Sequence, residues 1–175
     1  MKKLFVLSLL ITGFASLQAI AQKDDDKSKR PSPPAKVTVT VKSGATISID
    51  YSQPSVKGRT IGKDLEPMDG KVWRTGANEA TVFETDKDVT VNGQKLPAGK
   101  YGFFTLFSGN EVTLIFNKTW KQWGAFTYKE ADDVMRVKAK VVDAATATEK
   151  MTFTIDPKGN VSLLWGNKNV EFKVK

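Results

Sequence analysis

Polar side chains that can bind an anion or a sugar gather between Tyr51 and Glu84, where the alternation of apolar and polar residues found elsewhere in the chain stops. Binding residues are often placed in such irregular segments. Arginine offers a planar fork of donors for a carboxylate or phosphate, asparagine both donates and accepts, and glutamate accepts. The candidate ligand-binding residues of this segment are Arg59, Trp73, Arg74, Asn78 and Glu79. They predict a binding module for a small anionic ligand or a carbohydrate.

A structural role for the same residues is the alternative. Arg74 can pair with Glu79, Trp73 can close one end of the fold, and Asn78 can bond loop carbonyl groups. A long loop packed on a sheet needs ties of this kind, because its buried backbone groups require partners. Both interpretations stay open at the level of the sequence.

A second candidate site lies between Trp120 and Tyr128, where four aromatic residues fall within nine positions. Exposed aromatic rings stack on the faces of sugars, so Trp123 is added to the candidate ligand-binding residues. In the alternative interpretation these rings cover the core at the end of a strand.

The composition excludes several kinds of catalytic and metal site. The chain has no histidine and no cysteine, so it cannot contain a Ser-His-Asp or Cys-His catalytic group, a thiolate metal site or a disulfide. No catalytic residue, cofactor or metal ligand is predicted. The rival function is a hydrolase that cleaves glycans with Glu79 and a second carboxylate. The third interpretation is a structural protein of the cell envelope with no small ligand.

The positive charge of the chain is scattered rather than concentrated. The formal net charge is +8, and it falls to about +6 without Lys2 and Lys3. Nucleic-acid-binding proteins gather basic residues on one surface, whereas the arginines of this chain lie in unrelated segments. We therefore expect no nucleic-acid partner.

The first residues have the pattern of an export signal. Lys2 and Lys3 precede an apolar run at positions 4–14, and the small residues Ala19 and Ala21 favour cleavage before Gln22. The run is shorter than the roughly 20 residues needed to cross a bilayer, so no transmembrane segment is expected after cleavage. Residues 1–21 are predicted to be a signal peptide, residues 22–34 a disordered linker, and residues 35–175 a single domain. We expect a monomer in the periplasm or outside the cell.

The rest of the chain predicts an all-β fold. Apolar residues recur at every second position, as in Val37, Val39 and Val41, and Asn92-Gly93 is a strong hairpin turn because both residues accept positive φ. Residues 102–107 and 112–116 are apolar on both faces and are placed as central strands. About nine or ten short strands are expected, arranged as a two-sheet antiparallel β-sandwich, with a β-barrel as the alternative.

Several ordered blocks of sequence resemble an exported family of unknown function, DUF2911. The blocks are YSQPSVKGR at 51–59, GKVWRTGANEAT at 70–81, LPAGKYG at 96–102, IFN at 115–117 and WGAF at 123–126. The resemblance covers about Pro33 to Trp165, and Gln53 stands where the family pattern has arginine. It implies an exported single-domain protein and supplies no substrate, cofactor or catalytic residue.

Overall fold

The computed structural model of the protein describes residues 26–175. The predicted signal peptide, residues 1–21, and the start of the predicted linker lie outside the described residues. The strands are β1 (Pro34–Thr40), β2 (Thr46–Ser52), β3 (Val72–Trp73), β4 (Thr81–Thr85), β5 (Val89–Val91), β6 (Gln94–Leu96), β7 (Gly99–Ser108), β8 (Glu111–Asn117), β9 (Asp133–Ile155) and β10 (Asn160–Lys173). Two short 3-10 helices, η1 (Lys27–Lys29) and η2 (Glu130–Asp132), complete the secondary structure.

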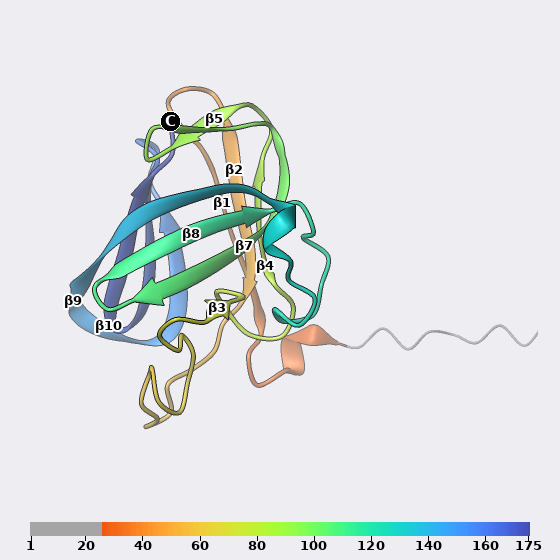
Figure 1. The fold of residues 1–175 in the computed structure, drawn as a ribbon. Coiled ribbons are helices and arrows are strands. Elements are labelled where there is room, and N and C mark those ends of the chain that lie inside the picture. Colours follow the sequence, from red (N-terminus) through yellow and green to blue (C-terminus); the bar gives the residue numbers. More distant parts are fainter. Residues whose placement is uncertain (1–25) are drawn as a thin grey trace, which may run out of the picture.

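Eight strands form one antiparallel sheet in the order β1-β2-β4-β7-β8-β9-β10, with β3 paired to β7. Strands β5 and β6 form a separate hairpin. The large sheet curls until its two ends face each other around one core, as Figure 1 shows. Backbone hydrogen bonds join the segment after β2 to β9: the Val56 amide donates to Glu149 and the Met151 amide donates to Pro54.

The predicted all-β, antiparallel fold of about nine or ten strands is confirmed with ten, and its shape lies between a sandwich and a barrel. The Asn92-Gly93 turn joins β5 to β6, with φ of 47° at Asn92 and 88° at Gly93. Local sequence therefore predicted this hairpin correctly, because few residues adopt positive φ without cost.

Interlocking aromatic rings fill the inside of the curled sheet. Phe116 meets Phe83 edge-on at 5.1 Å and Phe103 at 5.2 Å between ring centroids. Such edge-to-face pairs add to the hydrophobic gain from burial. On the outside, Phe104 and Ile115 are also fully buried, so β7 and β8 are covered on both faces as predicted.

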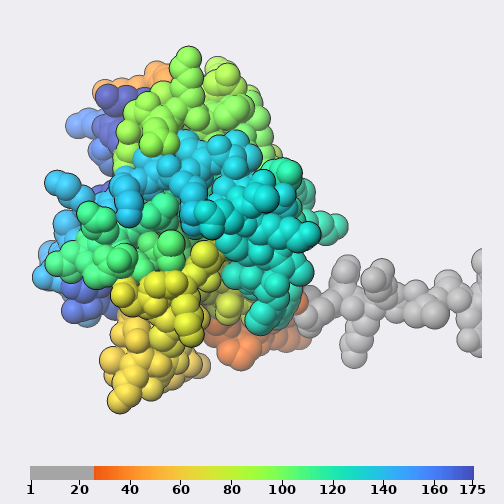
Figure 2. Space-filling model, in the orientation of Figure 1, coloured from red at the N-terminus to blue at the C-terminus, as the bar shows by residue number. Residues whose placement is uncertain are grey.

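Part of the predicted linker contacts the domain in this structure. Residues 27–32, called the N-terminal strap below, run from η1 toward β1 and lie beside the loop that precedes β4. Figure 2 shows the strap, in orange-red, next to the turquoise loop between β8 and η2. Within residues 26–175, no helix has the length and hydrophobicity required to cross a bilayer.

Candidate functional site

The loop from Arg74 to Ala80 has an unusual backbone. Thr75 and Asn78 have φ of 54° and 57°, values that are rare for residues other than glycine and especially for a β-branched one. Two bonds from Thr81 hold the loop: its hydroxyl donates to the Thr75 carbonyl at 2.8 Å and its amide to the Arg74 carbonyl at 3.1 Å. Non-glycine residues in this conformation are concentrated at functional sites, so this loop is the first candidate for a functional site.

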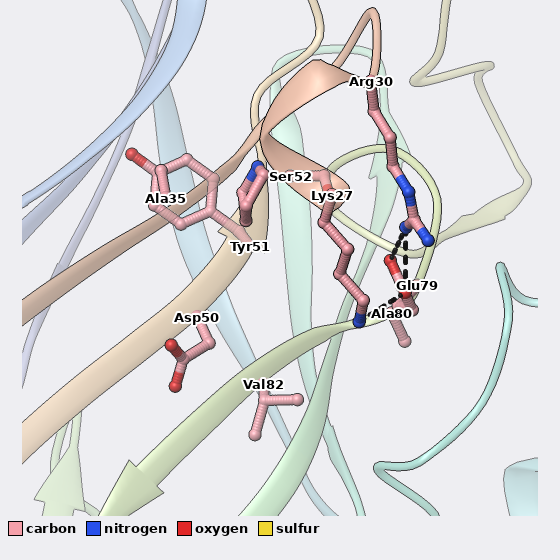
Figure 3. Close-up of a pocket in the computed structure, with 10 residues that line it drawn as sticks. Lys27, Arg30, Ala35, Asp50, Tyr51, Ser52, Glu79, Ala80 and Val82 are labelled. Atoms are coloured by element: carbon pink, nitrogen blue, oxygen red, sulfur yellow. Dashed lines mark hydrogen bonds and ion pairs between the residues drawn. The ribbon is translucent and has the colours of Figure 1, made fainter. Parts of the chain in front are cut away.

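Glu79 is bound by two cations of the N-terminal strap (Figure 3). One Nη of Arg30 lies 3.0 and 3.1 Å from the two carboxylate oxygens, and the Lys27 ammonium lies 3.0 Å away. Partial burial acts to raise the pKa of Glu79, but the hydrogen bonds from Lys27 and Arg30 outweigh it and lower the pKa to about 2. The carboxylate is therefore ionised at neutral pH and engaged by the chain itself.

Two further contacts hold the strap on the domain. The Asn78 side-chain amide donates to the Ser32 carbonyl at 2.9 Å, and the Arg30 guanidinium lies 5.8 Å from the Trp123 ring centroid, within cation–π range. Lys27 and Arg30 were not predicted as site residues, because residues 22–34 were expected to be a disordered linker. No local sequence pattern distinguishes Lys27 and Arg30 as site residues. Their charge is opposite to that of Glu79, but Glu79 lies 49 positions from Arg30 in the sequence.

A groove of about 240 Å³ lies beneath the strap, and Figure 3 shows its lining. Its charged residues already have partners: besides the pairs of Glu79, Asp50 pairs with Lys36 at 3.0 Å. The Tyr51 hydroxyl accepts the Phe153 amide at 3.1 Å. Few polar groups of the groove are therefore left to form hydrogen bonds or ion pairs with a ligand.

Replacing Glu79 with glutamine should loosen the strap. A partly exposed ion pair contributes about 1 kcal/mol, so trypsin should cleave after Lys27 and Lys29 roughly fivefold faster in Glu79→Gln at neutral pH. Glu84→Gln is the matched control, because Glu84 pairs with Lys100 at 3.1 Å and its side chain is 43% exposed, against 38% for Glu79. Equal cleavage of both variants would show that Glu79 does not hold the strap.

Acid should release the strap in the wild-type protein. The folded pKa of Glu79 lies below its ordinary value of 4.5, so its stabilising effect is complete above that pH and is lost as the pH falls toward about 2. Hydrogen exchange of residues 27–32, corrected for the intrinsic rate at each pH, should lose protection across this range. Constant protection down to pH about 2 would contradict the assignment.

Arg74 differs from Glu79 because it has no hydrogen-bond or ion-pair partner among the described residues. Its Nε is buried without a hydrogen bond, and the guanidinium makes no hydrogen bond or ion pair with any of residues 26–175. Burial lowers the pKa of Arg74, and the nearby charge of Glu66 acts in the opposite direction. The predicted Arg74–Glu79 pair is not formed. The structure thus contains a partly buried cation that forms no hydrogen bond or ion pair within residues 26–175.

The unpaired guanidinium lies beside Gly124. A methyl group built on Gly124 would lie 3.8 Å from one Nη of Arg74, and Gly124 has φ of 62°. The Gly124 amide donates to the Asn78 carbonyl at 3.0 Å, and Trp123 forms a β-bridge with Glu79. Residues 123–124 therefore bring Arg74, Asn78 and Glu79 into one region.

The aromatic stretch between β8 and η2 divides into exposed and packed rings. Trp120, Trp123 and Phe126 are 37%, 54% and 83% exposed. Tyr128 packs on Phe104 at 5.2 Å, so the predicted role as a core lid holds for this ring. Burial, with the nearby Asp133, raises the pKa of the Tyr128 hydroxyl.

Two predicted site residues lie elsewhere. The Arg59 guanidinium donates to the Ser55 and Val56 carbonyls at 2.7 and 3.1 Å, so it ties its own turn. The Trp73 side chain is buried in the core, where its indole N–H donates to the Gly76 carbonyl at 3.1 Å. Of the six predicted ligand-binding residues, Arg74, Asn78, Glu79 and Trp123 therefore come together and Arg59 and Trp73 do not.

Residues 32–174 match the family described as "Protein of unknown function (DUF2911)". The chain belongs to this family. The DUF2911 match includes the whole sheet and the Arg74–Ala80 loop, whereas Lys27 and Arg30 lie before it. No curated protein matches the chain, and no solved structure does. In the part of the chain that the structure describes, no three His, Cys, Asp or Glu side chains are grouped to hold a metal ion.

Proposed function

We propose that this DUF2911 protein is a binding protein for an acidic carbohydrate, which it holds with Arg74 and the exposed rings of Trp123 and Phe126. The observation that carries the proposal is the guanidinium of Arg74, which is partly buried and has no partner among the described residues. Removing a charge from water is costly unless an opposite charge compensates. A carboxylate from a ligand would supply that charge.

The chemistry of Arg74 favours a carboxylate or a similar planar anion. Its fork of N–H donors can form two parallel hydrogen bonds to the two oxygens of one carboxylate. The backbone on both sides is fixed, since Trp73 is buried and Thr75 is held at positive φ. Arg74 therefore loses little conformational freedom when it binds, which favours affinity.

The neighbouring rings favour a sugar as the body of the ligand. Phe126 is 83% exposed and Trp123 is 54% exposed, and both flank Gly124, next to Arg74. Aromatic rings stack on the apolar C–H faces of sugars. An acidic sugar combines a ring that stacks with a carboxylate that Arg74 can bind.

The geometry gives less support to a glycan hydrolase that uses Glu79. A general acid in such an enzyme needs a raised pKa so that it carries a proton near neutral pH. The pKa of Glu79 is instead lowered to about 2, and its oxygens are bound by Arg30 and Lys27. These contacts suit a structural carboxylate.

The proposal places the protein outside the cytoplasm, in the periplasm or extracellular space, as a monomer. The pattern of residues 1–21 supports export followed by cleavage. Acidic polysaccharides of an envelope would then be accessible ligands. A mature protein whose mass begins at Gln22 is expected from the exported chain, and an uncleaved mass would contradict this part.

Calorimetry with trigalacturonic acid and its fully methyl-esterified form tests the proposal. The acid should bind, and the ester should bind at least about tenfold more weakly, because a charge-assisted hydrogen bond contributes roughly 1.5–3 kcal/mol. Arg74→Ala should weaken binding of the acid by a similar factor. Arg59→Ala is the matched control, since Arg59 bonds only its own turn, and it should bind like wild type.

Three outcomes would count against the proposal. Equal binding of acid and ester would remove the role of the carboxylate. Unchanged binding by a folded Arg74→Ala variant would remove the role of Arg74. If neither trimer bound, the envelope protein with no small ligand would become the better interpretation.

A further inference from the structure

A second, separate cavity of about 270 Å³ opens at the end of the curled sheet where β3 lies. Its walls come from the loop before β3, the turn between β7 and β8, and β10 (Figure 1). Arg74, Trp123 and Phe126 are not among its lining residues. At roughly 30 Å³ for each molecule of liquid water, the volume corresponds to about nine waters.

Three aromatic residues, Trp73, Phe107 and Trp165, form part of the wall. Trp73 and Phe107 are 6.5 Å apart between ring centroids and are tilted by 53°. Both indole N–H groups are already used: Trp73 donates to the Gly76 carbonyl at 3.1 Å and Trp165 to the Glu66 carbonyl at 2.8 Å. The rings therefore present only their apolar surfaces to a ligand, and these surfaces hold water poorly.

The mouth of the cavity carries one carboxylate without a counterion. Lys168 is paired with Asp143 at 2.7 Å, so its charge is balanced. Asp69 accepts the Gly109 amide at 2.9 Å through one oxygen, and it forms no ion pair with any of residues 26–175. A negative charge thus stands beside aromatic walls at the entrance.

We propose that this cavity binds a small quaternary ammonium compound, with the methylated nitrogen against Trp73, Phe107 and Trp165 and its charge balanced by Asp69. The negative faces of aromatic rings attract cations, and quaternary ammonium groups suit them because their charge is spread over apolar methyl groups. Asp69 is exposed, so a neutral ligand of the same shape would gain nothing from its charge, whereas a cation would be attracted to it. The choline cation, with about seven non-hydrogen atoms, fits a volume of about nine waters.

The charge of the whole chain makes this binding specific to the cavity. The formal net charge is +8, or about +6 without Lys2 and Lys3, so the protein as a whole repels cations. Uptake of a cation must therefore come from the local arrangement of rings and carboxylate.

Choline and its neutral isostere 3,3-dimethylbutan-1-ol are the probes that test the inference, with tryptophan fluorescence and calorimetry on the whole mature protein as readouts. Choline should bind, and the alcohol, which has the same shape without the charge, should bind at least about fivefold more weakly. Asp69→Asn should weaken choline binding about three- to tenfold. Asp64→Asn is the matched control, because Asp64 is exposed in the same loop and does not line the cavity.

A second pair of variants tests the position of the site. Val141 lines the cavity, whereas its neighbour Val142 is 38% exposed and does not. Val141→Phe should fill the cavity and abolish choline binding, and Val142→Phe should leave it unchanged. Arg74→Ala should also bind choline normally, so this site and the proposed carbohydrate site can fail independently.

Each contrary result would overturn the inference. Equal affinity for choline and the alcohol would show a cavity that selects apolar shape and ignores charge. Wild-type affinity in both Asp69→Asn and Val141→Phe would place choline elsewhere. Even a very weak site would bind choline at about 100 mM, so the absence of binding up to that concentration would overturn the proposal.

Discussion

Replacing Trp73 with alanine should lower the free energy of unfolding by about 3–5 kcal/mol, the usual cost of removing a large buried aromatic side chain. The Trp73 ring is only 2% exposed and packs against Phe107. Its indole also satisfies the Gly76 carbonyl at 3.1 Å, which the variant would leave without that donor. The loss should be large because the neighbouring cavity would grow, and the fold cannot collapse fully into it.

Urea denaturation followed by circular dichroism measures this effect. Trp123→Ala is the matched control, because it removes the same side chain from a position that is 54% exposed, and its stability should stay within about 0.5 kcal/mol of wild type. Similar losses in the two variants would contradict the assignment of Trp73 to the core. The comparison also distinguishes Trp73, which stabilises the fold, from Trp123, whose proposed role is to contact a ligand.

Gly159→Ala should destabilise the protein by about 3 kcal/mol or more. Gly159 has φ of 80°, and a methyl group built there would lie 1.9 Å from the Val174 carbonyl oxygen. The strain of positive φ costs about 1–2 kcal/mol, and forcing the backbone apart adds about 1–3 kcal/mol. The displaced segment would lose the bond from the Val174 amide to the Gly159 carbonyl, now 2.8 Å long.

Gly93→Ala separates the two contributions. Gly93 has φ of 88°, close to the value at Gly159, but nothing lies within 4 Å of a methyl group built on it. This variant should therefore show only the backbone cost, about 1–2 kcal/mol by thermal or chemical denaturation. Equal losses of unfolding free energy in the Gly93 and Gly159 variants would mean that the C-terminal segment moves away from the added methyl group without cost.

Trp73 at the end of β3 and Arg74 directly after it serve two different regions. Successive side chains of a strand point to opposite faces. Trp73 faces the inside and lines the apolar cavity, whereas Val72 packs on the outer cluster and Arg74 lies beside Gly124. Adjacent residues that look like one site in the sequence thus belong to two separate candidate sites.

Much of the fold could be predicted because strand patterns are local. The alternation at Val37, Val39 and Val41 predicted β1 together with the first residue after it, and the two-sided apolar runs predicted β7 and β8. The degree of curling was not predictable in this way, since it depends on how the eight strands of the large sheet twist together. The choice between sandwich and barrel therefore needed the tertiary structure.

The sequence predicted most residues of the candidate site, but it predicted only part of the contacts between them. Arg74, Asn78, Glu79 and Trp123 come together, but the partner of Glu79 is Arg30 rather than Arg74. Arg59 was grouped with them because it is near in sequence, although its guanidinium bonds only its own turn. Side-chain chemistry is readable from the sequence, whereas pairing depends on distance in space.

The sequence by itself determined that this chain forms antiparallel strands, where its tight turns lie and that it belongs to an all-β class, because side-chain alternation and turn preference act over a few neighbouring residues. Only the tertiary structure decided which charges meet. Arg30 pairs with Glu79 from 49 positions away, and Arg74 has no hydrogen bond or ion pair within residues 26–175. Such pairings follow from the path of the whole backbone, and no short stretch of residues contains that path.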